Sequence, residues 1–117
     1  MTPENFVTQL RKAVVDENIA IYRDLFESTA PDAASDPYWK RALSFYDSLD
    51  EAGRRVLFEI MRQTSVDTVS NLLAVLDGVS ALDSAREDFV LRTSSDPQQI
   101  NGSLQDLFLE ADERNRQ

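Results

Sequence analysis

The stretch DEAGRRVLFEIMRQTSVDTVSNLLAVLDG, residues 50–78, decides the fold, because it is the longest part of the chain that reads as one element. Asp50 can accept hydrogen bonds from the free backbone N–H groups of a first helical turn. Gly78 can adopt the left-handed conformation that closes a helix. About 27 residues lie between them, which is roughly 40 Å of helix at about 1.5 Å per residue. The sequence therefore predicts one long central helix, around which the rest of the chain packs.

The apolar side of this predicted helix changes along its length. On a helical wheel at about 100° per residue, the apolar residues of the second half lie on a side rotated by roughly 150° from those of the first half. The first set is Val56, Leu57, Ile60 and Met61, and the second is Val66, Val69, Leu72, Leu73 and Leu76. We therefore expect the helix to kink, or to change its packing partners, near residues 63–65.

Polar side chains occupy the positions where the first apolar side would continue, namely Thr64, Asp67, Thr68 and Asn71. Three interpretations remain open: a solvated patch exposed by the change of partners, an inward site for a ligand or a partner's polar group, and a closed buried network. Under the second, these residues together with Trp39 form the candidate ligand or partner site. A buried group without a hydrogen bond would cost about 1–3 kcal/mol, so the fold has to resolve the choice.

Upstream, the sequence predicts a long N-terminal helix with two apolar stripes. Thr2 is a suitable cap and Pro3 suits the first helical position. One stripe is Phe6, Val7, Leu10, Val14, Ile21 and Leu25, and a second, about 110° away along the later half, is Val15, Ile19, Tyr22 and Phe26. Since one core needs only one stripe, the later half is expected to lie between two neighbouring elements or to be covered by a second copy of the chain. The second stripe is therefore the candidate interface, and a homodimer is one of the alternatives.

A shorter aromatic helix is expected after a loop at residues 28–37. Asp36 and Pro37 suit its cap and first position. Its predicted inner face carries Tyr38, Trp39, Ala42, Phe45, Tyr46 and Leu49, which we expect to pack in the core, with Trp39 toward one edge. Only residues 48–50 separate this helix from the central one, so the two are expected to be close antiparallel neighbours.

Beyond Gly78 we expect a small β-hairpin and a C-terminal helix. Residues 89–91 and 99–101 favour two strands joined by a turn at residues 94–97. In a competing register, residues 101 and 102 form the hairpin turn instead. The C-terminal helix is indicated by a capping box formed by Ser103 and Asp106 and by the helical spacing of Leu104, Leu107, Phe108 and Ala111, whereas residues 112–117 are expected to fray.

The predicted fold is one domain over residues 1–117, mainly α, with a three-helix core on which the hairpin and the C-terminal helix pack. Hydrophobic residues make up 42% of the chain, which is enough for one core and too much for disorder. No run approaches about 18 consecutive apolar residues, and the N-terminus lacks the basic and apolar segments of a secretion signal, so no membrane partner is expected. The absence of cysteine fits a reducing cytoplasm, and we expect a cytoplasmic protein.

Charge and missing residue types argue against several functions. The chain carries 21 acidic and 12 basic residues, a net charge of −9, which repels phosphate backbones, so nucleic acid is not an expected partner. With no histidine and no cysteine, the serine–histidine and cysteine–histidine nucleophile pairs and the usual zinc sites cannot be built from this chain. Three glycines, at positions 53, 78 and 102, allow no dinucleotide-binding or phosphate-binding loop. We therefore expect no catalytic residues, no metal site and no cofactor.

Three classes of function remain. The favoured one is a protein-interaction module whose partner is another protein or a second copy of the chain. A narrower version is an inhibitor that neutralises a basic partner, in the manner of immunity proteins, with the net charge of −9 steering association. The alternative is a small-ligand-binding domain with a polar site around Asp67 and Asn71. An enzyme is the third class.

Overall fold

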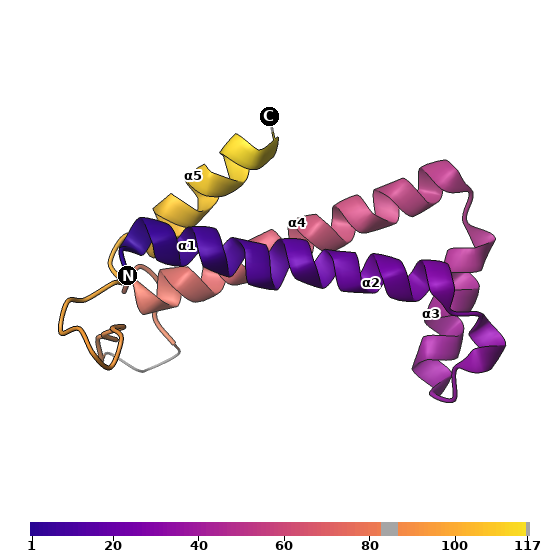
Figure 1. The fold of residues 1–117 in the computed structure, drawn as a ribbon, viewed down its shortest axis with the longest axis horizontal. Coiled ribbons are helices and arrows are strands. Elements are labelled where there is room, and N and C mark those ends of the chain that lie inside the picture. Colours follow the sequence, from indigo (N-terminus) through magenta and orange to yellow (C-terminus); the bar gives the residue numbers. More distant parts are fainter. Residues whose placement is uncertain (83–86, 117) are drawn as a thin grey trace.

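The computed structural model describes residues 1–82 and 87–116, and two long helical segments form its frame. They run in opposite directions and cross each other, and α5 packs against α1 and α4 at the end that holds the N-terminus (Figure 1). The helices in chain order are α1 (Pro3–Arg11), a π-helical turn (Lys12–Asp16), α2 (Glu17–Ser28), a 3-10 turn (Pro31–Ala33), α3 (Pro37–Ser48), α4 (Glu51–Leu76) and α5 (Leu104–Arg116). The prediction of a mainly α protein is confirmed.

Local signals in the sequence determine where the helices begin. The side chains of Thr2, Asp36 and Asp50 accept backbone N–H groups of the first turns of α1, α3 and α4 at 3.1, 2.9 and 2.8 Å. Each cap satisfies a donor that has no partner within the helix itself. The central helix is continuous to Leu76, and Gly78 follows it with a φ of +81°. The single central rod predicted from residues 50–78 is therefore confirmed.

The π turn explains the two apolar stripes of the N-terminal helix. A π turn holds about one extra residue, so it rotates the side presented by the following helix by about 100°. Val14 and Ile21, which belong to the first stripe, are accordingly exposed after the turn begins. The buried and half-buried apolar side chains of this segment are Phe6, Val7, Leu10, Val15, Ile19, Tyr22, Leu25 and Phe26. The two stripes thus form one continuous buried and half-buried side of this segment.

The core consists of two clusters, so the single three-helix core of the prediction is wrong. The first, which we call the α5 cluster, contains Val7, Val15, Val66, Leu73, Ile100, Leu104 and Phe108. The second, which we call the aromatic cluster, contains Phe26, Leu43, Tyr46 and Phe58. The central helix α4 contributes to both clusters and changes neighbours between Met61 and Val66, where the sequence pattern predicts a change of partners.

The predicted β-hairpin is wrong, because no strand forms in residues 1–82 or 87–116. The segment before α5 nevertheless turns back on itself. Thr93 C=O accepts the N–H of Asp96 at 3.3 Å, and Ile100 N–H donates to Leu91 C=O at 2.8 Å. One backbone bond between two short segments is too little for a sheet, since even a complete isolated hairpin is only marginally stable in water.

A buried asparagine side chain replaces the missing strand ladder. Asn101 accepts the N–H of Leu91 at 2.7 Å, donates to Phe89 C=O at 2.8 Å and also donates to Leu76 C=O at the end of α4. A single amide group therefore satisfies three backbone groups and fixes the segment to α4. The competing register, with the hairpin turn at residues 101 and 102, is not formed either, because α5 begins at Leu104.

The start and the end of α5 also differ from the prediction. Asp77, just after α4, accepts the N–H groups of Gly102 and Gln105 at 2.7 and 2.8 Å, so a carboxylate from a neighbouring helix caps α5 in place of the expected capping box. The tail that was expected to fray is helical as far as Arg116. Asp112 in that tail is only 1% exposed.

The molecule is extended for its size. It measures 50 × 35 × 26 Å, and its radius of gyration is 17.8 Å, against about 13 Å for a compact chain of this length. Its accessible surface is 8106 Å², whereas a compact protein of this mass exposes about 6,400 Å². The chain therefore exposes about 1,700 Å² more surface than a compact fold would.

Candidate protein-binding groove

An apolar groove opens between α2, α3 and α4, beside the aromatic cluster, with a volume of about 450 Å³. Its lining contains no charged side chain and consists of Asn18, Ile19, Tyr22, Phe26, Tyr38, Ala42, Phe45, Leu57, Ile60, Met61, Thr64 and Ser65. In the chain as a whole, 28% of residues are charged. Depletion of charge and enrichment in aromatic residues and methionine are typical of the centre of a protein–protein interface.

Phe26 of the aromatic cluster lines this groove, together with Tyr22, Leu57 and Met61, which pack against the cluster. Phe26 stacks on Tyr46 with ring centroids 5.0 Å apart, and Tyr22 lies 5.9 Å from Trp39. Leu43, in the same cluster, is 1% exposed. Close packing holds the buried side chains next to the groove in defined rotamers.

The rim of the groove carries large apolar side chains that face solvent. Tyr38, Phe45 and Ile60 are 56%, 54% and 58% exposed, and Val56, one helical turn before Ile60, is 49% exposed. Single exposed apolar residues are ordinary, but several around one apolar hollow mark an interaction surface.

A larger concavity of about 560 Å³ also borders the aromatic cluster, and its lining is charged. The Arg23 guanidinium lies 4.4 Å from the Phe58 ring centroid, and that of Arg54 lies 4.3 Å from the Tyr46 centroid. Glu27 and Glu51 line the same concavity, so cationic and anionic groups offset each other there. The arginines cover these rings with polar groups, whereas the apolar groove stays uncovered.

The polar candidate site on α4 lies on an exposed surface. Thr64, Asp67, Thr68 and Asn71 are all exposed. Asp67 accepts a hydrogen bond from the Gln63 side chain at 2.9 Å, and the Thr68 hydroxyl donates to Thr64 C=O at 2.8 Å. Thr64 also lines the apolar groove. The side chains of Asp67 and Thr68 therefore have local partners within α4.

Trp39, the fifth residue of that candidate site, lies in different surroundings. It is half-buried against the aromatic cluster and lies 5.9 Å from the ring of Tyr22 and 6.2 Å from that of Phe26. It also lines a small hollow with Asp36 and Leu43 at the start of α3. Packing between α2 and α3 therefore accounts for its position.

The candidate interface residues divide between the two cores. Val15 is fully buried in the α5 cluster, while Ile19, Tyr22 and Phe26 line the groove. Sequence reasoning missed the rim residues because it assigned each whole stripe to the core. In the pairs Phe45–Tyr46 and Ile60–Met61, the second residue packs on the aromatic cluster and the first is exposed. The available signal was the width of the apolar stripes on these two helices, which is greater than the contact with one neighbouring helix requires.

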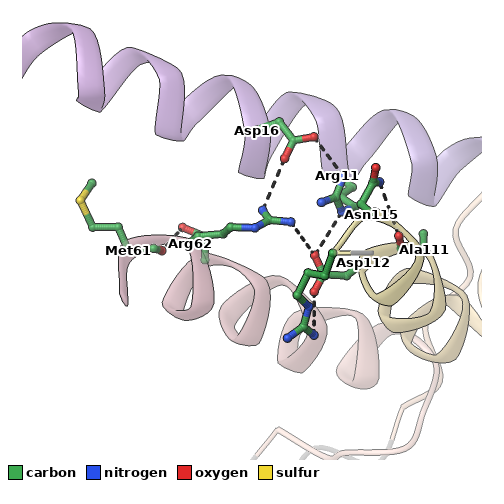
Figure 2. A network of polar contacts seen from close by, with 9 residues as sticks. Arg11, Asp16, Met61, Arg62, Ala111, Asp112 and Asn115 are labelled. Carbon is green, nitrogen blue, oxygen red and sulfur yellow. Dashed lines mark hydrogen bonds and ion pairs between the residues drawn. The ribbon is translucent and has the colours of Figure 1, made fainter. Parts of the chain in front are cut away.

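A network of charged side chains lies between the two cores and joins α1, the π turn, α4 and α5 (Figure 2). Asp112 accepts Arg11 Nε at 3.2 Å and Arg62 Nη2 at 2.9 Å on one carboxylate oxygen, and Arg116 Nη2 at 3.0 Å on the other. Asp16 binds Arg11 at 3.0 Å and Arg62 at 3.4 Å. Sequence reasoning did not identify this network, because Arg62 lies 46 positions from Asp16 and 50 from Asp112, and Arg11 lies 101 positions from Asp112.

Burial shows what this network does. Arg11 is 5% exposed, and a buried charge without partners would be strongly destabilising. No buried side-chain nitrogen or oxygen in the described residues lacks a hydrogen-bond partner. The network therefore fastens α5 to α1 and α4, and its buried members, Arg11 and Asp112, are not open to a ligand.

Comparison with known proteins returned no matching family model, no matching curated protein and no matching solved structure. In the described part of the chain, no helix combines the length and the apolar character needed to span a bilayer. Within the same residues, no three acidic side chains are grouped as a metal site. The fold and the groove define the class: a mainly α-helical protein with an extended shape and an uncharged apolar groove between α2, α3 and α4.

Proposed function

We propose that this chain is a protein-interaction module and that the groove between α2, α3 and α4 is its binding surface. The observation that carries the proposal is the uncharged lining of this groove, bordered by the exposed side chains of Tyr38, Phe45 and Ile60. Burying such a surface is worth roughly 25 cal/mol for each Å² of apolar area removed from water. A partner that covers the groove removes this apolar area from water, which stabilises the complex.

The lining also bears on the kind of partner. A surface built to neutralise a basic protein would place carboxylates where the partner's cations dock. The groove has none, although the chain has 21 acidic residues elsewhere to choose from. The net charge of −9 would then act at long range, as steering and as a solubilising coat. The groove favours an apolar partner surface over a basic one.

Affinity capture from a native lysate with three matched baits tests the proposal. The baits are the wild-type chain, a groove variant Phe45→Ser and a control variant Val90→Ser. Val90 is 64% exposed, and the next residue, Leu91, packs against the α5 cluster, so the control removes a similar exposed apolar group away from the groove. The mass of each recovered complex is measured by light scattering.

The expected result is that the wild type and the control recover the same complex and that the groove variant recovers little or none of it. Truncating an aromatic residue that anchors an interface weakens binding by more than about 1 kcal/mol, or about fivefold. Equal recovery by all three baits would overturn the assignment of the groove as the binding surface.

A further inference from the structure

We infer that the occupant of the groove is the same groove of a second copy of the chain, in a two-fold symmetric dimer. The inference rests on the proposed function and names its partner. The surface in question consists of the groove and its rim residues Tyr38, Phe45 and Ile60. Three independent properties of the molecule point to this occupant.

The first property is area. The chain exposes about 1,700 Å² more than a compact protein of its mass. A stable dimer interface of standard size buries about 800 Å² on each partner. The excess surface of the molecule is therefore larger than one such interface requires.

The second property is self-complementarity of shape. A two-fold interface uses the same patch on both copies, so the patch must supply both a hollow and the groups that fill it. This patch has a hollow of about 450 Å³ and, at its rim, two exposed aromatic rings and an isoleucine. The rim side chains of one copy can enter the hollow of the other.

The third property is charge. Two copies each carrying −9 repel one another, and contact is favourable only across a face that places no like charges opposite each other. The groove meets that condition, because none of its lining residues is charged. The same repulsion predicts a salt effect of definite sign. Screening weakens it over about 10 Å at 0.1 M salt, so added salt should tighten a dimer of this chain, whereas it would weaken a complex with a basic partner.

Sedimentation of the purified chain at several protein and salt concentrations tests the inference. We expect the mass to rise from 13.2 kDa toward twice that value, and the dissociation constant to fall as salt is added. A mass that stays at one chain up to about 1 mM, the range of very weak complexes, would overturn the inference. Dimerisation that weakens with salt would overturn it as well.

Matched variants locate the interface. Ile60→Glu places a charge in the groove, and Val90→Glu makes the same charge change at a site of similar exposure elsewhere. We expect Ile60→Glu to raise the dissociation constant at least about tenfold and Val90→Glu to change it less than about twofold. Equal effects of both variants would place the contact outside the groove. Circular dichroism of each variant checks that the helices are intact.

A second measurement does not depend on breaking the dimer. The chain has no cysteine, so a single spin label attached at Thr64→Cys, beside the groove, reports only distances between copies. We expect a shorter distance between copies from this position than from a label at Val90→Cys, and the reverse order would overturn the inference. If the chain stays monomeric while the groove variant still loses a captured complex, the dimer is wrong and the proposed function stands. If the groove variants change neither dimerisation nor the captured complex, the dimer and the proposed function are both wrong.

Discussion

The two ends of the molecule solve the problem of burial in opposite ways. At the end formed by α1, α5 and the later part of α4, buried polar groups such as Asp112 and Asn101 find all their partners within the chain. At the end formed by α2, α3 and the start of α4, the core is aromatic and a groove beside it remains uncovered. Figure 1 shows α5 covering the first end, while no other helix of the described chain covers the second.

This difference teaches how to tell structural polar groups from functional surface. A charged group that is buried and fully paired, as Asp112 is, stabilises the fold and has nothing left to offer a ligand. An apolar surface that stays exposed, as at Phe45 and Ile60, does not stabilise the isolated chain. It contributes favourable free energy only when a partner buries it. Function is therefore to be sought at the end with the fewer internal polar bonds.

The largest effect on folding is expected at the charged network. Replacing Asp112 with alanine removes the shared acceptor of three arginines and leaves Arg11 buried beside only Asp16. Breaking a buried ion pair by removing one partner costs about 3–5 kcal/mol, so Asp112→Ala should lower the free energy of unfolding by that amount. Denaturant titration followed by circular dichroism measures it.

Asp16 supplies the matched control for this comparison. It bonds two of the same arginines, but its side chain is 46% exposed. Exposed ion pairs contribute about 0–1 kcal/mol because water screens them, so Asp16→Ala should cost no more than that. If both variants lost the same stability, burial of Asp112 would not be what makes the network matter.

The next effect concerns the segment that replaces the predicted hairpin. Asn101→Ala leaves the backbone groups of Phe89, Leu91 and Leu76 without their side-chain partner. Losing hydrogen bonds at a buried amide costs about 1–3 kcal/mol, and we expect faster hydrogen exchange at the Leu91 amide in addition. Asn101→Asp is the control, since it keeps the acceptor for Leu91 and loses both donated bonds. Unchanged exchange in the alanine variant would contradict the role of this side chain.

The sequence was sufficient for the features set by local chemistry. The caps at Thr2, Asp36 and Asp50, the continuous α4 and the change of partners along it follow from residues within a few positions of each other. Periodicity also placed Ile19 and Tyr22, now walls of the groove, on a second apolar stripe. These signals act within one or two helical turns, so they can be recognised from a single sequence.

Features that depend on distant residues were not predicted. The cap of α5 comes from Asp77, and the buried role of Asp112 depends on Arg11 and Arg62, so neither can be read from the C-terminal sequence alone. The π turn is a third example. It merges two stripes into one side, yet nothing within residues 12–16 marks it. Arg11, just before the turn, and Asp16, its last residue, form an ion pair at 3.0 Å in the network.

The smallest effect on stability is expected at the exposed polar patch of α4. Asp67 is exposed and its bond to Gln63 spans one helical turn, so Asp67→Ala should change the free energy of unfolding by less than about 0.5 kcal/mol. Denaturant titration against Gln63→Ala, which removes the same bond from the other side, checks the value. A loss of several kcal/mol from Asp67→Ala alone would show that its carboxylate has a second, buried partner and would move the search for a binding site from the groove back to this patch.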